Sequence, residues 1–228
     1  MKSKRLCFGK NGIMTANKII ALHGFLGSPN DFDFLKKDFD IDAPNLLEYV
    51  QNDFDILAEK IITEPCHILG YSFGARLGAR LKIKYPNMVK KCFLLSGHMG
   101  LKTSTERESR VEFENSMIQK LSELSSADFL RFWNGLDLFT FDEPLQGDYH
   151  LKDWVSFFEK YGLSKQAYLL DDLLKFKSDI FFGYGKQDLK YKNYANYELN
   201  DFFVKFFDGG HRVLRNEEAV VQTLKDNL

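Results

Sequence analysis

The feature that most constrains the fold of this chain is an alternation of short apolar runs with amphipathic helical patterns. The run KIIALHG (18–24) is apolar enough for a buried strand, and PNDFDFLKKDF (29–39) places Phe32, Leu35 and Phe39 on one face of a helix. Strands that alternate with helices indicate a mostly parallel sheet with helices on both faces. The other predicted strands are 40–45, 66–71, 91–97, 179–185 and 203–210, and the other predicted helices of this part are 53–63, 75–86 and 217–224.

The alternation stops between residues 101 and 177, where no segment has the pattern of a strand. The stretches there have the spacing of polar and amphipathic helices. A helical insertion between two core strands predicts a cap over the carboxyl edge of the sheet, where open α/β sheets place their sites. We therefore expect residues 1–100 and 178–228 to form one α/β core and residues 101–177 to form a helical cap.

Composition excludes several classes of protein. The 228 residues suffice for one domain with a sizeable core, and the net charge of -1 gives no electrostatic reason for a nucleic-acid or membrane partner. No run approaches the roughly 20 apolar residues of a membrane span. The three cysteines, Cys7, Cys66 and Cys92, lack metal-ligand spacing. With an N-terminus that lacks a long apolar segment, they predict a cytoplasmic protein that needs no metal and no cofactor.

The segment Gly70-Tyr71-Ser72-Phe73-Gly74 follows a predicted strand and opens a predicted helix. This is the context of the G-x-S-x-G nucleophile elbow, in which a strained turn exposes the serine hydroxyl. Glycine on either side lets neighbouring backbone approach without a Cβ clash. The motif and its context make Ser72 the candidate catalytic serine.

An acid and a histidine follow in the order that such enzymes use, serine first and histidine last. Asp188 comes after the fifth predicted strand and His211 after the sixth. Asp179 and Asp208 are weaker candidates for the acid, because each adjoins a strand end instead of following it by a loop. The chain thus predicts a triad of Ser72, His211 and Asp188.

The segment His23-Gly24-Phe25 follows the first predicted strand, where this kind of fold carries an oxyanion hole. We expect the backbone N–H groups of Phe25 and Phe73 to supply its two donors. His23 is expected to hold the loop by hydrogen bonds and not to carry a proton. Asn30 is the expected cap of the helix that follows.

Together these motifs resemble those of the 2-succinyl-6-hydroxy-2,4-cyclohexadiene-1-carboxylate synthases of the menaquinone pathway, lyases with the α/β-hydrolase fold. Four departures are visible: Met99 replaces a proline, Glu114 an aspartate and Leu214 a second histidine, and DAPNLLEY (42–49) replaces a D-x-P-G-H-G turn. The matching segments are LHGFLGSPNDF (22–32), GYSFGARL (70–77), SGHMGL (96–101), ERESRVEFE (106–114), FWNGLDLF (132–139), GKQDLKYKNYA (185–195) and GGHRVLRNEE (209–218).

The resemblance implies an elimination that releases pyruvate from an enolpyruvyl ether. Ser72 would then act as a base, activated by His211 and oriented by Asp188, without forming an acyl intermediate. An oxyanion hole suits the enolate charge that develops in such a reaction.

The resemblance also implies a small substrate with several carboxylates, which arginine matches in geometry and charge. Arg76 and Arg110 are the implied contacts, Arg107 is a second cap contact or a surface residue, and Trp133 is a wall of the cap. A further arginine in the later cap helices of the family has no clear match, and its candidate replacements are Lys160 and Lys165.

Two other functions remain open on the sequence. A carboxylesterase or thioesterase would keep the triad, use Ser72 as a nucleophile and prefer a mostly apolar cap pocket. A ligand-binding relative without catalysis would typically lack Ser72 or His211, and both are present.

Overall fold

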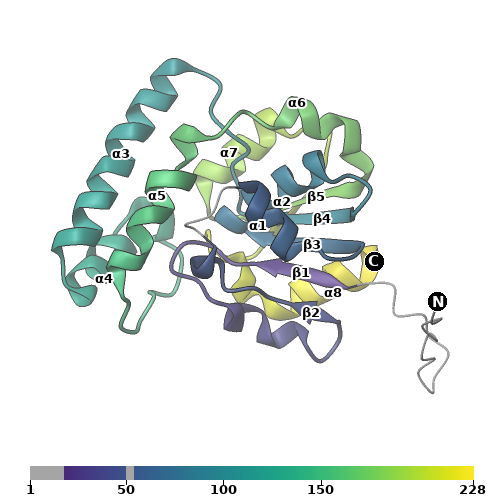
Figure 1. Ribbon diagram of the computed structural model, residues 1–228, viewed down its shortest axis with the longest axis horizontal. Helices are drawn as coiled ribbons and strands as arrows, with labels where there is room; N and C mark the ends of the chain where they lie inside the picture. Colours follow the sequence, from purple (N-terminus) through teal and green to yellow (C-terminus); the bar gives the residue numbers. More distant parts are fainter. Residues whose placement is uncertain (1–17, 50–53) are drawn as a thin grey trace, which may run out of the picture.

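The computed structural model describes residues 18–49 and 54–228, so Cys7 and the predicted N-terminal features lie outside the described residues. Six strands form one parallel sheet in the order β2-β1-β3-β4-β5-β6, which confirms the predicted parallel α/β architecture (Figure 1). The strands are β1 (Ile19–Leu22), β2 (Ile41–Asp42), β3 (Cys66–Tyr71), β4 (Val89–Leu95), β5 (Ile180–Gly185) and β6 (Phe203–Phe207).

Helices fill most of the connections between these strands. The α-helices are α1 (Phe54–Ile61), α2 (Phe73–Lys84), α3 (Ser104–Glu123), α4 (Ser126–Asn134), α5 (Val155–Tyr161), α6 (Leu170–Leu173), α7 (Leu189–Glu198) and α8 (Glu217–Asn227). Short 3₁₀ helices are η1 (Pro29–Leu35), η2 (Leu46–Glu48), η3 (Asp137–Phe139), η4 (Leu151–Trp154), η5 (Leu163–Lys165), η6 (Leu174–Asp179) and η7 (Val213–Arg215). Among the described residues, none of the helices combines the length and the hydropathy needed to cross a membrane.

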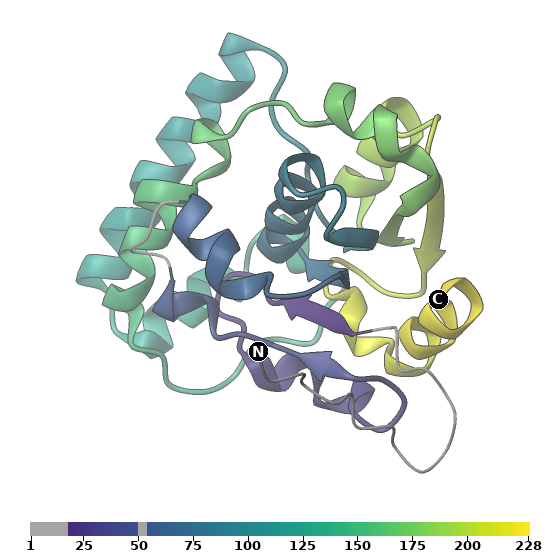
Figure 2. The same ribbon diagram turned by 45° about the vertical axis from the view of Figure 1, so that its right-hand side comes forward.

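The inner strands β1, β3, β4 and β5 are mostly buried on both faces, and their side chains alternate between two cores. Cys92 and Leu94 of β4 pack in the core that contains α1 and α2, whereas Phe93 and Leu95 pack in the core that contains η1 and α8. This period of two is the geometry of a pleated strand. Figures 1 and 2 show the corresponding layers, with α1 and α2 on one face of the sheet and α8 on the other.

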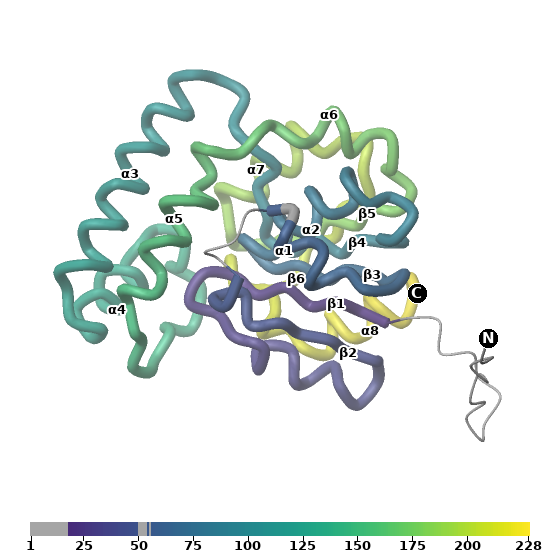
Figure 3. The backbone as a smooth tube through the Cα atoms, viewed as in Figure 1, coloured from purple at the N-terminus to yellow at the C-terminus, as the bar shows by residue number. Residues whose placement is uncertain are grey.

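The helices α3, α4 and α5 lie beyond the carboxyl ends of the strands, at the left of Figure 1 and of the tube in Figure 3. In the described chain from Ser104 to Asp179, every regular element is a helix. The order in which strands are added to the sheet reverses at β1, since β2 lies on one side of β1 and β3 on the other. Such a switch point leaves a crevice at the carboxyl edge of a parallel sheet.

The helix predicted over 29–39 is present but shorter, and its predicted cap was wrong. The 3₁₀ helix η1 covers Pro29–Leu35, and Phe32 and Leu35, three residues apart, are both fully buried on its inner side. Ser28, not Asn30, caps this helix, and its backbone N–H donates to Asp31 Oδ2 at 3.2 Å. Pro29 occupies the first helical position, where a missing N–H costs nothing.

Candidate active site

Ser72 lies on a strained turn between β3 and α2. Its φ of 53° and ψ of -106° place a non-glycine residue in a sparsely populated region. The turn is tight because backbone passes on both sides of it. A Cβ on Gly74 would lie 1.9 Å from the carbonyl oxygen of Leu22, and one on Gly70 would lie 2.4 Å from the carbonyl oxygen of Gly74. The glycines of the elbow are therefore required by the close approach of β1, β3 and α2.

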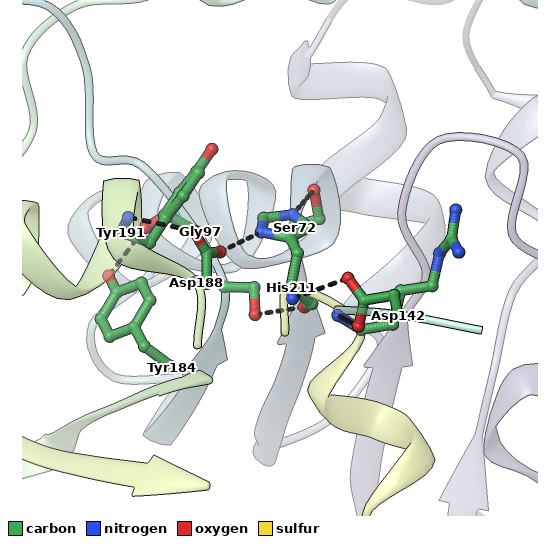
Figure 4. A network of polar contacts seen from close by, with 9 residues as sticks. Ser72, Gly97, Asp142, Tyr184, Asp188, Tyr191 and His211 are labelled. Atoms are coloured by element: carbon green, nitrogen blue, oxygen red, sulfur yellow. Dashed lines mark hydrogen bonds and ion pairs between the residues drawn. The ribbon is translucent and has the colours of Figure 1, made fainter. Parts of the chain in front are cut away.

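The structure brings the three predicted triad side chains together at the carboxyl ends of β3, β5 and β6 (Figure 4). His211 Nδ1 lies 2.7 Å from Asp188 Oδ2, and His211 Nε2 lies 3.4 Å from Ser72 Oγ. The His211 and Asp188 side chains are almost completely buried. A hydroxyl, an imidazole and a carboxylate in this order can move a proton away from the serine.

Asp188 also caps a helix. Its Oδ1 accepts the backbone N–H of Tyr191, in the first turn of α7, at 3.1 Å, while Oδ2 faces the histidine. One carboxylate thus fixes both the helix and the imidazole. The alternative acids are engaged elsewhere, Asp179 with Lys82 at 2.9 Å and Asp208 with an exposed lysine at 2.6 Å.

Phe25 and Phe73 both line the cavity in front of Ser72. Phe73 is the first residue of α2, so its N–H has no acceptor within the helix. In the described part of the chain no hydrogen-bond acceptor is found for the N–H of Phe25 either. Both residues therefore offer free backbone donors beside the serine.

The cavity has a volume of about 420 Å³ and lies between the carboxyl edge of the sheet and the helical segment that the sequence predicts to be a cap. Its cap side is aromatic: the ring of Phe25 lies 4.8 Å from that of Trp133 and 5.1 Å from that of Phe158, and the ring of Phe73 lies 4.4 Å from that of Phe157. Trp133 is thus a wall residue, at the position that the resemblance implies for it.

Arg76 provides a buried positive charge in this cavity. Its guanidinium is 5.5 Å from the ring of Phe73, and its Nη1 is buried without a hydrogen-bond partner among the described residues. Burial, with a smaller effect of Arg110, lowers the pKa of Arg76 to about 10, so the group remains charged at neutral pH. A buried charge without a counterion is costly, and a bound anion would relieve that cost.

Arg110 and Arg107, the other arginines predicted to bind substrate, both have partners within the protein. Arg110 lines the cavity, but its Nε is 2.7 Å from Glu114 Oε1, so it has an internal counterion. Arg107 does not belong to the described lining. Its guanidinium donates to the backbone carbonyls of Ser164, Gln166 and Leu101. The prediction of Arg107 as a substrate contact is therefore not supported, and its role is to join the start of α3 to η5.

The candidate replacements for the missing cap arginine lie elsewhere too. Lys160 and Lys165 are not among the described residues that line the cavity. Two cations that the sequence did not single out do line it, Arg212 and Arg215. Arg212 directly follows His211, and this adjacency was the only signal in the sequence.

His23 has the structural role expected of it. Its Nε2 accepts the backbone N–H of Leu46 at 2.9 Å, and its Nδ1 faces the carbonyl of Gly24 at 2.9 Å. Donation from Nδ1 and acceptance at Nε2 require the neutral ring, and burial lowers the pKa of His23 to about 4. The altered loop after Pro44 is thereby tied to the segment that carries Phe25.

Met99, where the resembling family has proline, makes a contact that proline cannot make. Its backbone N–H donates to the hydroxyl of Tyr194 at 3.1 Å. The Tyr194 ring in turn stacks on His98 at 4.3 Å. His98 lines the cavity, and its buried Nδ1 has no hydrogen-bond partner within 18–49 and 54–228. Burial together with nearby Arg76 lowers the pKa of His98 to about 4.

The sequence was compared with known families and with known proteins. No model of a known protein family matches the chain. A candidate 2-succinyl-6-hydroxy-2,4-cyclohexadiene-1-carboxylate synthase of Bacillus subtilis (strain 168) is 24% identical over 163 residues, which make up 63% of this chain and 60% of that relative. The matched segment therefore spans less than two thirds of the relative's length.

Solved structures show the fold more completely. The structure of MenH from S. aureus superimposes with a TM-score of 0.80 at 16% identity and covers 95% of both chains. A carboxylesterase structure from the ammonia-oxidizing Thaumarchaeon Nitrososphaera gargenis gives a TM-score of 0.63 at 14% identity, with 95% of this chain and 91% of that chain covered. The thioesterase domain from the curacin biosynthetic pathway gives 0.54 at 16% identity, with 91% and 90% covered. The chain has the α/β-hydrolase fold.

Proposed function

We propose that this protein, an α/β-hydrolase-fold chain that resembles 2-succinyl-6-hydroxy-2,4-cyclohexadiene-1-carboxylate synthase, is a lyase. Its substrate is 2-succinyl-5-enolpyruvyl-6-hydroxy-3-cyclohexene-1-carboxylate, from which it eliminates pyruvate in menaquinone biosynthesis. The observation that carries the proposal is Arg76, a buried cation in the same cavity as Ser72 whose Nη1 has no hydrogen-bond partner among the described residues. A neutral ester gives such a charge nothing to pair with, whereas a substrate with several carboxylates does.

In this reaction Ser72 serves as a base. His211 takes the proton from Ser72 Oγ. At the same time the serine oxygen removes a proton from the ring carbon that is α to the succinyl carbonyl. The electron pair of the broken C–H bond forms a double bond to the next ring carbon, the existing ring double bond shifts by one position, and the C–O bond to the enolpyruvyl group breaks. Protonated His211 then gives its proton to the leaving enolpyruvate, which becomes pyruvate, and Ser72 Oγ keeps the proton from the substrate. The hydroxyl and the neutral imidazole are thereby restored, so atoms and charge balance.

The remaining residues bind the substrate and stabilise charge. Asp188 holds His211 with its Nε2 toward the serine. The free N–H groups of Phe25 and Phe73 stabilise the developing enolate oxygen. Arg76 binds one carboxylate directly, and Arg110, already paired with Glu114, assists a second.

The aromatic cap wall favours a second candidate function. Phe25, Trp133 and Phe157 form an apolar surface that would also suit the acyl group of an ester or thioester. Ser72 would then be a nucleophile and carry an acyl group between two half-reactions.

One pair of assays separates the two functions. The purified protein is offered the enolpyruvyl precursor and p-nitrophenyl acetate side by side, and pyruvate and p-nitrophenol are followed. We expect pyruvate release, with kcat reduced about 10²- to 10⁴-fold in Ser72→Ala, the usual range for loss of a general base. Ser122→Ala, on the exposed side of α3, is the matched control. Rapid ester cleavage with an acyl group trapped on Ser72 and no pyruvate would refute the lyase.

A further inference from the structure

The loop that carries His211 is held by a carboxylate from the cap. Asp142, which follows η3, accepts the backbone N–H of His211 on Oδ2 at 2.8 Å and that of Arg212 on Oδ1 at 2.9 Å (Figure 4). The two donors are consecutive amides, so each carboxylate oxygen is used by one of them. Hydrogen bonds to a charged acceptor are stronger than those to a neutral one, and two in parallel fix orientation as well as distance.

The connection also runs from the loop back to the cap. The Arg212 guanidinium donates to the backbone carbonyl of Glu143 and to Asn134 Oδ1, and it lies 4.3 Å from the ring centre of Phe139. Phe139 in turn meets the His211 ring edge-on at 5.7 Å. Cap residues on both sides of Asp142 therefore contact the histidine loop.

The core holds the same loop at different atoms. Ser96 Oγ donates to the carbonyl of His211 at 2.7 Å, and Asp188 binds the imidazole at Nδ1. The backbone N–H of His211 has Asp142 as its acceptor. A Cβ on Gly210 would lie 2.7 Å from Asp142 Oδ2, so the missing side chain lets the carboxylate reach the loop.

The distance that this arrangement controls is critical. His211 Nε2 lies 3.4 Å from Ser72 Oγ, which is longer than an ordinary hydrogen bond from a hydroxyl. A shift of a few tenths of an ångström in the loop decides whether the imidazole receives the serine proton.

We propose that Asp142 is a positioning residue for His211, through which the cap sets the alignment of the imidazole with Ser72. The proposal rests on the proposed function only in one respect, that His211 takes the proton of Ser72. It holds whether Ser72 then acts as a base or as a nucleophile, since both need that transfer.

The test measures the reactivity of Ser72 without any substrate. A fluorophosphonate probe labels an activated serine, so its labelling rate reports the Ser72–His211 pair directly. We expect the rate to fall about 10-fold in Asp142→Asn, which removes the charge and keeps one acceptor oxygen, and further in Asp142→Ala, which also removes the remaining hydrogen bond. In the substrate assay kcat should fall in parallel while KM changes little.

Asp137→Asn is the matched control, because Asp137 belongs to the same cap segment and its side chain is exposed. Thermal unfolding of every variant confirms that labelling is measured on folded protein, and Asp142→Asn serves if Asp142→Ala does not fold. Unchanged labelling in Asp142→Asn, or an equal loss in Asp137→Asn, would overturn the proposal. The proposal would also be overturned if Asp142→Asn shifted the pH profile of the labelling rate without changing its plateau value, because the carboxylate would then act through its charge alone. If the labelling rate falls in Asp142→Asn as expected but the protein releases no pyruvate, the lyase proposal is refuted and the positioning role of Asp142 is retained.

Discussion

Two arginines near the cavity show how differently the same side chain is used. Arg76 is buried on α2, and its Nη1 has no partner in the described ranges, whereas Arg107 donates to three backbone carbonyls at the start of α3. The first arrangement costs stability and suits a bound anion, and the second contributes stability. Variants of the two arginines can therefore distinguish an effect on substrate binding from an effect on the stability of the fold.

We expect Arg76→Met, which keeps most of the volume and removes the charge, to raise KM for the carboxylated substrate about 10- to 100-fold. The same change should leave the free energy of unfolding unchanged or raise it by about 1–3 kcal/mol, because an uncompensated buried charge is removed. Steady-state kinetics and urea unfolding measure the two effects.

Arg107→Met is the paired variant, and we expect the opposite pattern from it. Three carbonyls lose their donor, so stability should fall by about 2 kcal/mol while KM changes little. If Arg76→Met destabilises the protein and leaves KM unchanged, Arg76 is a structural residue and the assignment of the carboxylate site is wrong.

At the scale of elements, the junction of β1, β3 and α2 positions the reactive groups. β3 ends directly before the strained Ser72, α2 begins directly after it, and β1 leads into the loop of Phe25. The three elements come together only because Gly70 and Gly74 carry no side chain. The elbow motif is thus a packing requirement as well as a catalytic signature.

Gly74→Ala tests this requirement. The new methyl would lie 1.9 Å from the carbonyl oxygen of Leu22 and 2.8 Å from that of His23, and both are backbone atoms that cannot move alone. We expect a loss of about 3 kcal/mol or more in the free energy of unfolding, with reduced fluorophosphonate labelling of Ser72.

Gly135→Ala at the end of α4 provides the comparison. Its Cβ would lie no closer than 3.2 Å to any atom of its surroundings, and its φ of -81° suits any residue. Stability should change by less than about 1 kcal/mol. Equal stability of the two variants would contradict the packing account of the elbow.

At the scale of the whole molecule, burial of neutral histidines makes stability depend on pH. The pKa values of His23, His67 and His98 are each lowered to about 4, in every case mainly by burial. Arg76, Arg110 and Lys190 lower the pKa of His98 further, and Glu106 opposes them. Each imidazole is neutral in the folded protein at a pH where the unfolded chain already binds a proton.

The direction of the effect follows from linkage. Between pH 6.5 and about 4 the unfolded state binds more protons, so the stability that is present above pH 6.5 is lost as pH falls through this window. Each fully displaced proton contributes about 1.4 kcal/mol for each pH unit. We expect the free energy of unfolding in urea to fall steadily from pH 6.5 to 4.5.

Carboxylates also titrate near the lower end of this range, so a variant isolates the histidine effect. His67 lies on β3 outside the described cavity lining, and its Nδ1 has no partner in the described chain. His67→Phe should reduce the slope of the free energy of unfolding against pH by the equivalent of about one proton. An identical slope in this variant would show that the buried His67 does not contribute.

Much of the fold and part of the candidate site could be predicted from the sequence. The bounds of β3 were predicted to the residue, because a short apolar run before an elbow is a local pattern. Ser72, Asp188 and His211 could be selected for a related reason. Each follows a predicted strand, and the carboxyl ends of parallel strands meet at one edge of a sheet.

The tertiary structure alone decided which partner each charged side chain has. Arg107 could not be distinguished from Arg110 by sequence, since both lie in one charged helix, and Asp142 carried no motif although it holds a loop 69 residues away. Periodicity and local motifs report the backbone and the face of an element, because these depend on near neighbours in the chain. A hydrogen-bond partner depends on which distant segments pack together, and only the folded chain determines that.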